Sequence, residues 1–138
     1  MALVVPNDSE VIMLQYITNN DAPENISIRL YINNVTPDES STLGTFTEVL
    51  NEAGYTTGGQ SLTPGSWTIL TGNPSQAEHT EITWTFTGAL TAPGDVYGYY
   101  VTRDTGGELM WAERFSNGPF NITTNGDEIK VTPRLTLE

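Results

Sequence analysis

Apolar and polar residues alternate with a period of two along much of the chain, which is typical of half-buried strands. The clearest case lies between residues 26 and 32, where isoleucine and leucine occupy every second position. We therefore expect a strand whose apolar side chains face a core. The intervening Ser27, Arg29 and Tyr31 are expected to face solvent.

The same alternation recurs in later segments bounded by Pro-Gly or Gly-Gly turn signals. These predicted strands cover residues 66–71, 82–87, 95–103, 109–115 and 128–137. A tight turn at 104–107 predicts that residues 95–115 form an antiparallel hairpin. Pro133 lies inside the last segment and indicates an edge strand or a bulge. The predicted core residues are Ile28, Leu30, Ile69, Ile82, Trp84, Phe86, Val131 and Leu135.

The N-terminal region differs, because its apolar residues follow a helical spacing. Val11, Leu14 and Ile17 are three residues apart, which predicts a helix over 8–18. Asn7 is placed to cap this helix, with Glu10 as the capping-box acid. Before the cap runs an apolar arm, residues 1–6.

These patterns together predict a mainly β protein. Six or seven strands separated by turns favour an antiparallel β-sandwich or jelly-roll-like domain. We expect one domain over residues 1–138, with residues 1–20 forming the N-terminal arm and short helix. Residues 33–65 contain turn signals but no regular apolar period. We therefore expect them to form a long segment outside the sheets, which we call the excursion.

The net charge of −12 excludes several classes of partner. Arg29 is the one basic residue within positions 1–100, so there is no basic patch for nucleic acid or for an anionic membrane. No apolar run approaches the roughly 20 residues that span a bilayer. The acidity fits either solubility alone or docking onto a basic surface of a larger assembly.

The sequence offers no recognisable catalytic or cofactor site. It has no cysteine and no G-x-S-x-G motif, and its one histidine, His79, lies in a polar segment where a solvated side chain is expected. Acidic residues at 125–128 and 33–39 leave a structural Ca²⁺ as an alternative to simple turn chemistry. We therefore expect a protein that is not an enzyme and holds no cofactor.

A few apolar and aromatic residues are candidates for an interface. The alternation places Trp67 and Trp84 in the core, whereas Trp111 and Tyr100 could face outward on the predicted hairpin. A free apolar arm could pair with another subunit, or it could fold back onto its own sheet. The candidate interface residues are thus Leu3, Val4, Val5, Tyr100 and Trp111, with a glycan-binding platform as an alternative use of the aromatic residues.

Several segments together resemble small structural proteins of tailed bacteriophage virions. The segments that carry the resemblance are Val5–Asn7, Pro23–Asn25, Gly98–Val101, Leu109–Phe115, Gly118–Phe120 and Gly126–Pro133. The resemblance implies a non-enzymatic capsid decoration (cement) protein on the virion surface, made in the host cytoplasm. It implies attachment to the major capsid protein or other virion subunits, and a homo-oligomer, with a trimer favoured. A tail, fibre or adaptor component, with receptor or glycan binding, is the alternative.

Overall fold

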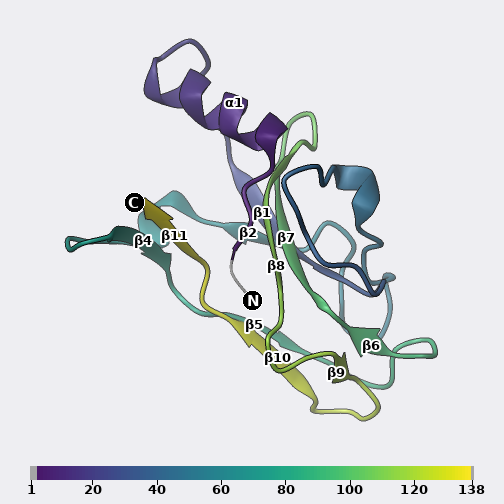
Figure 1. Cartoon of the computed structure of the whole chain (residues 1–138). Helices are drawn as coiled ribbons and strands as arrows, with labels where there is room; N and C mark the ends of the chain where they lie inside the picture. The colour runs from purple at the N-terminus through teal and green to yellow at the C-terminus, as the bar shows by residue number, and fades with distance from the viewer. Residues whose placement is uncertain (1–2, 138) are drawn as a thin grey trace.

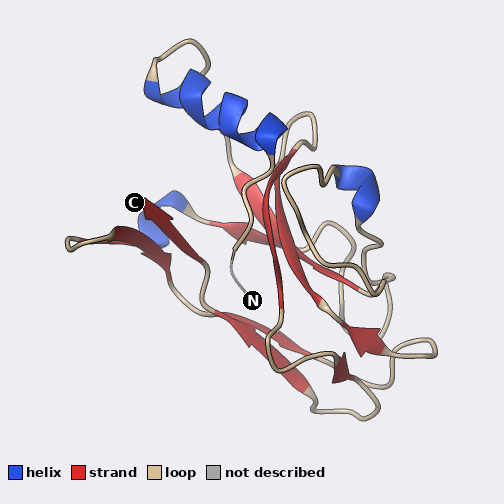
Figure 2. Ribbon diagram, viewed as in Figure 1, coloured by secondary structure: helices blue, strands red, loops and turns tan. Residues whose placement is uncertain are grey.

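The computed structural model describes residues 3–137 and shows a mainly β protein with one α-helix and several antiparallel sheets (Figures 1 and 2). The prediction of a mainly β protein with antiparallel sheets and a short N-terminal helix is therefore confirmed. The elements in chain order are α1 (Asn7–Ile17), β1 (Ile26–Tyr31), η1 (Leu43–Thr45), β2 (Gln60–Leu62), η2 (Pro64–Ser66), β3 (Trp67–Leu70), β4 (Ser75–His79), β5 (Ile82–Thr85), β6 (Asp95–Val96), β7 (Gly98–Arg103), β8 (Leu109–Arg114), β9 (Phe120–Asn121), β10 (Glu128–Val131) and β11 (Arg134–Leu137).

The largest sheet has four strands in the order β2-β1-β7-β8, all antiparallel. Its centre is the β1–β7 pair, in which Ile28 lies opposite Val101. The predicted hairpin is present as β7–β8, with a register shift after Val101. β6 separates from β7 and pairs with β9 instead.

One face of this sheet packs against the antiparallel pair β5–β10, and the two layers share the main core. The predicted core residues Ile28, Leu30, Ile82, Trp84, Phe86 and Val131 are all buried there. Because residues two apart on a strand face the same side of the sheet, the alternation in the sequence correctly identifies this inner face.

The other face of the sheet is also covered, contrary to the prediction from the alternation. Tyr31 is fully buried and Ser27 nearly so, whereas both were predicted to face solvent. The excursion after β1 folds back across this face, and Phe46 packs its ring 5.0 Å from the rings of both Tyr31 and Tyr100. This second cluster also contains Leu109 and Ala112.

The predicted C-terminal strand changes partner at Pro133. Its first half, β10, pairs with β5, and its second half, β11, pairs with β4. With β3 on the far side of β4, these strands form the three-stranded lateral sheet, β11-β4-β3. Figure 1 shows this sheet extending away from the four-stranded sheet.

The lateral sheet corrects two predictions. Ile69, expected in the core, is 68% exposed, because its part of the lateral sheet has no second layer opposite it. Leu135 is half-buried against the edge of the core rather than enclosed. Ser75–His79 forms a central strand although its sequence has no apolar alternation.

The helix starts one residue earlier than predicted and lacks the predicted cap. Its N-cap is Pro6, with no side-chain hydrogen bond, and Asn7 is already helical. The Asn7 backbone N–H instead donates to the carbonyl oxygen of Glu39 (3.0 Å), in the long segment between β1 and β2. This bond supplies a partner for one of the N–H groups that the first turn of a helix leaves without an acceptor.

Candidate functional site

The outer face of α1 is the most distinctive surface of the described chain. Val11, Leu14 and Ile17 are 54%, 60% and 77% exposed. Spaced three residues apart, they lie along one side of the helix. The opposite side is apolar too, because Ile12 is buried, and Met13 and Tyr16 pack against the main core. A helix that is apolar on both sides is normally buried on both sides.

The spacing of Val11, Leu14 and Ile17 predicts the helix, and the structure shows which of its sides is packed. The packed side is formed by Ile12, with Met13 and Tyr16. Between Val11 and Ile17 only Gln15 is polar, which is more apolar surface than one packed face requires.

The start of α1 is fixed to the four-stranded sheet by a buried polar contact. The Ser9 hydroxyl donates a hydrogen bond to the carbonyl oxygen of Leu109 (2.5 Å), at the start of β8. Ser9 is fully buried, and Ile12 follows it on the same side of the helix. The outer face therefore points away from the body of the protein on a firmly held helix.

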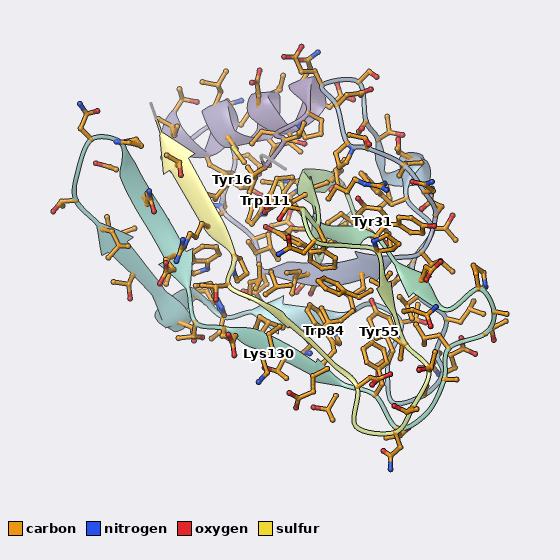
Figure 3. The ribbon with its side chains drawn as sticks, turned by 60° about the horizontal axis from the view of Figure 1, so that its bottom comes forward. Tyr16, Tyr31, Tyr55, Trp84, Trp111 and Lys130 are labelled. Atoms are coloured by element: carbon orange, nitrogen blue, oxygen red, sulfur yellow. The ribbon has the colours of Figure 1, made fainter. Side chains whose placement is uncertain are left out.

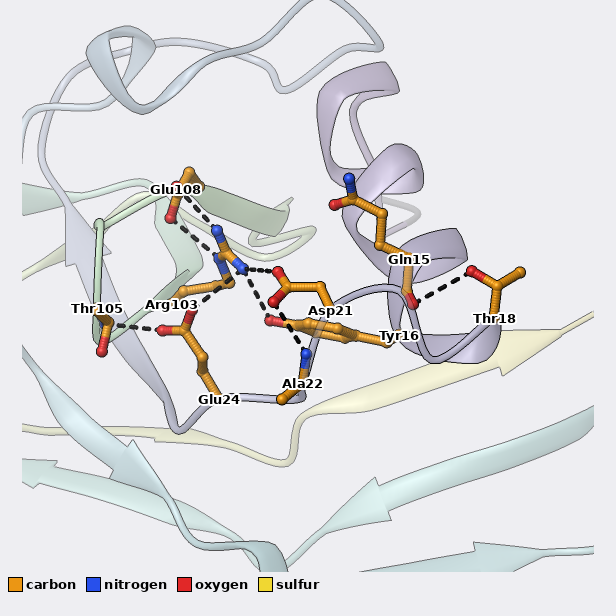
Figure 4. A network of polar contacts seen from close by, with 9 residues as sticks. All are labelled: Gln15, Tyr16, Thr18, Asp21, Ala22, Glu24, Arg103, Thr105 and Glu108. Atoms are coloured by element: carbon orange, nitrogen blue, oxygen red, sulfur yellow. Dashed lines mark hydrogen bonds and ion pairs between the residues drawn. The ribbon is translucent and has the colours of Figure 1, made fainter.

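The end of α1 is held by an ionic network around Arg103 of β7 (Figure 4). Its Nη1 lies 3.0 Å from Asp21 Oδ2 and 3.2 Å from Glu24 Oε1, and it donates to the Tyr16 hydroxyl (3.3 Å). Nη2 and Nε bind the two carboxylate oxygens of Glu108 at 2.9 and 3.0 Å. Three carboxylates thus converge on one largely buried guanidinium and join the segment after α1 to the β7–β8 hairpin.

The protonation energetics of this network agree with its geometry. The hydrogen bonds to Glu108 raise the pKa of the Arg103 guanidinium, and those from Arg103 lower the pKa of the Glu108 carboxyl. The Thr105 backbone N–H also donates to Glu24 (3.1 Å), so the turn of the hairpin is tied to the same carboxylates. The network is a structural clamp between the segment after α1 and the β7–β8 hairpin.

The charges around the outer face of α1 are negative. Asp8 and Glu10 lie exposed in the first turn, and the last turn contains no basic residue. Asp21 follows shortly after the helix. A protein partner for this face would therefore need apolar side chains at its centre and basic side chains at its rim.

The predicted arm residues lie on the protein's own sheet. Val4 forms an antiparallel bridge with Ala112 of β8, in which each N–H donates to the other carbonyl at 2.9 Å. Leu3 and Val5 are half-buried against the main core. Met1 and Ala2 of the predicted arm lie outside the described residues. Val4 therefore occupies part of the edge of β8 that a neighbouring subunit would otherwise use.

The two aromatic residues proposed for an interface are in the interior. Trp111 is 1% and Tyr100 2% exposed, so neither presents a contact surface. Trp111 packs edge-on against Trp67, with ring centroids 6.4 Å apart. Figure 3 shows Trp111, Tyr31 and Trp84 among the interior side chains. The expectation of an outward Trp111 and Tyr100 was wrong because both faces of the sheet are covered.

His79 is buried rather than solvated, contrary to the sequence-based expectation. Its Nδ1 lies 2.7 Å from the Thr80 carbonyl oxygen, and its ring packs edge-on against Trp67 at 5.1 Å. It stands where the lateral sheet joins the core. Its contacts are those of a packed core residue.

The acidic segments considered for Ca²⁺ are engaged in turn hydrogen bonds. Asp127 accepts from the backbone N–H groups of Thr123 (2.8 Å) and Thr124 (3.0 Å), and Asp38 accepts from Ser40 (2.9 Å). These bonds lower the pKa of the Asp127 and Asp38 carboxyls. Within residues 3–137 there is no group of three or more histidine or acidic side chains arranged to hold a metal ion.

The hollows of the surface are shallow. One of about 270 Å³ lies beside the start of α1 and includes Asp8, Ile12 and Glu108. A wider groove of about 600 Å³ runs between the arm and residues 38–40. In the groove the Ser40 hydroxyl donates to the Asp38 carboxylate (2.7 Å), which is a bond within one turn. The outer face of α1 is the stronger candidate site.

Comparison with protein-family models, with curated proteins and with solved structures finds no match for this chain. Across the part of the chain that the structure describes, no helix combines the length and the apolar character needed to cross a bilayer.

Proposed function

We propose that this chain is a non-enzymatic structural module that attaches to a larger particle through the outer face of α1. The observation that carries the proposal is the row Val11, Leu14 and Ile17, exposed on a helix whose other side is packed. Anchors at this spacing are typical of a helix that lies in an apolar groove of a partner.

The charge of the chain indicates the kind of groove. The helix contributes Asp8 and Glu10 and no basic residue, and the whole chain carries −12. The partner groove should therefore have lysine and arginine side chains around an apolar floor. Attachment should weaken as salt screens the charge at the rim.

The resemblance to virion proteins of tailed bacteriophages suggests that the larger particle is a virion. We propose a capsid decoration protein on the virion surface, with the major capsid protein as partner; a tail, fibre or adaptor component is the second candidate. A measurement of copy number by quantitative mass spectrometry of purified virions separates the two. Decoration predicts on the order of hundreds of copies, set by the symmetry of the shell, and a tail component far fewer. Absence of the chain from virions would contradict both.

The attachment surface is tested by returning the purified chain to particles that lack it. Leu14→Lys should reduce the bound fraction roughly tenfold or more, because it places a charge at the centre of the buried contact. Leu50→Lys is the matched control, since Leu50 is similarly exposed (54%, against 60% for Leu14) but lies in the segment between β1 and β2. Equal binding of Leu14→Lys and Leu50→Lys would show that α1 is not the attachment surface.

A further inference from the structure

The outer edge of β3 is an unprotected strand edge. Within the described residues β3 pairs with β4 alone. Its sequence, Trp67–Leu70, contains no charged residue and no proline, and Ile69 and Leu70 are both exposed. Natural edge strands are usually protected by a lysine, a proline, a bulge or a covering segment. Among residues 3–137, β3 has no lysine, proline or register shift, and no second strand pairs with its outer edge.

The hydrogen-bond pattern shows which backbone groups this edge offers. The Thr80 N–H donates to the Ser66 carbonyl (3.0 Å), so this pair is hydrogen-bonded across β3 and β4. Because bonding alternates along an antiparallel strand, Thr68 and Leu70 also bond inward to β4. The N–H and carbonyl of Ile69 then point outward, as does the carbonyl of Trp67.

The charge distribution favours a second copy of this chain as the occupant. From Ala53 to Ala77 the sequence holds no charged side chain, although the whole chain carries −12. Near β3 the charged residues of the lateral sheet are Glu78 and Arg134, which bind each other. Two copies that meet at β3 bring together segments without charged side chains, so the net charge of each chain opposes this contact less than it opposes contact between acidic surfaces.

We propose that two copies of this chain associate through antiparallel pairing of their β3 edges about a two-fold axis at Ile69. The outward groups of Ile69 in one copy bond to those of Ile69 in the other. The two lateral sheets thereby form one continuous six-stranded sheet. Such a contact is the same surface on both copies, so it closes as a dimer, in place of the trimer expected from the resemblance. This proposal does not depend on the function proposed for α1.

The contact is expected to be reversible. Four strand residues and two exposed apolar side chains bury less than the roughly 800 Å² per partner of a standard stable interface. Dimers should therefore form with rising protein concentration. Sedimentation velocity over a concentration series measures this equilibrium directly.

The absence of cysteine permits a direct test of the pairing. Residues opposite each other in a hydrogen-bonded antiparallel pair have Cα atoms about 5.5 Å apart, within the range that a disulfide bridges. Ile69→Cys should therefore form a cross-linked dimer on mild oxidation, much faster than the control Leu50→Cys. Equal rates for the two variants would overturn the proposal.

Variants without cysteine provide a second readout. Ile69→Lys keeps every bond between β3 and β4 but should weaken dimerisation roughly tenfold or more, since two lysines face each other across the axis. Leu14→Lys should leave dimerisation unchanged, and Ile69→Lys should leave particle attachment unchanged, so failure of either proposal is seen separately. A wild-type chain that stays monomeric at every accessible concentration, or that forms trimers, overturns the two-fold pairing.

Discussion

At Gly98 the backbone of β7 passes so close to its neighbours that no side chain fits. A Cβ atom there would lie 2.6 Å from the Tyr31 hydroxyl and would collide with the Glu113 carbonyl oxygen of β8. We predict that Gly98→Ala lowers the free energy of unfolding by about 1–3 kcal/mol, the usual cost of overpacking a core. Gly88→Ala is the control, because a Cβ at Gly88 meets no atom within 4 Å. Urea unfolding followed by tryptophan fluorescence compares them, and equal losses would show that this close approach is not rigid.

Single residues also show where the alternation of apolar and polar positions predicts burial correctly and where it fails. It correctly placed Ile28 and Trp84 in the core, because both strands have a second layer opposite them. It failed for Tyr31 and for Ile69 for opposite reasons. A segment without periodicity covers Tyr31, and the lateral sheet around Ile69 has no cover. Alternation defines the two faces of a strand, but whether each face is covered depends on distant parts of the chain.

Among the elements, α1 depends on Arg103 for the position of its C-terminal end. We predict that Arg103→Gln lowers the free energy of unfolding by about 1–3 kcal/mol, because three carboxylates are left facing one another without a cation. The loss should shrink in high salt, which screens that repulsion. Hydrogen exchange of the α1 amides should also accelerate.

The control for Arg103 is the exposed pair Lys130–Glu128, whose side chains are about half accessible. Lys130→Gln should change the free energy of unfolding by no more than about 0.5 kcal/mol, as is usual for surface ion pairs. If the two substitutions had equal effects, the network would not be holding α1.

The helices and strands differ in how well they can be predicted from the sequence. The β7–β8 hairpin was predictable because its turn and its alternation agree. β4 was not, because Ser75, Ala77 and His79 form no apolar face, and this strand is stabilised by pairing with β3 and β11 on its two sides. The exposed apolar face of α1 was partly predictable, because the sequence shows an excess of apolar residues between Val11 and Ile17. Which of them face outward depends on how the helix packs against the sheet.

For the whole molecule, buried tyrosines set the limit of stability at high pH. Burial raises the pKa of Tyr31 and of Tyr100 to about 12, and it raises those of Tyr55 and Tyr99 as well. In the unfolded chain these groups ionise near their ordinary value of 10.0. Below pH 10 the hydroxyls of these tyrosines are protonated in the folded and in the unfolded chain, so their ionisation does not change stability there. The free energy of unfolding therefore falls as pH rises from 10 towards 12.

We predict that each such tyrosine contributes a decline of about 1.4 kcal/mol per pH unit once the unfolded chain is ionised. Urea unfolding at a series of alkaline pH values measures the slope. In the Tyr100→Phe variant the free energy of unfolding should fall less steeply with pH, by about 1.4 kcal/mol per pH unit. An unchanged slope in this variant would show that Tyr100 ionises as readily in the folded protein as in the unfolded chain.

The change of partner at Pro133 divides the molecule into two units that can open separately. β4 continues into β5 and β10 into β11, so two neighbouring chain segments pass from the core into the lateral sheet. The core around Trp84 is enclosed, whereas the lateral sheet buries few side chains beyond His79 and Trp67. Amide protons of β3 and β4 should therefore exchange through a sub-global opening, and those of β1 and β7 through complete unfolding. We expect the lateral sheet to open as a foldon of its own, hinged where the His79 backbone N–H donates to the Pro133 carbonyl oxygen (2.9 Å).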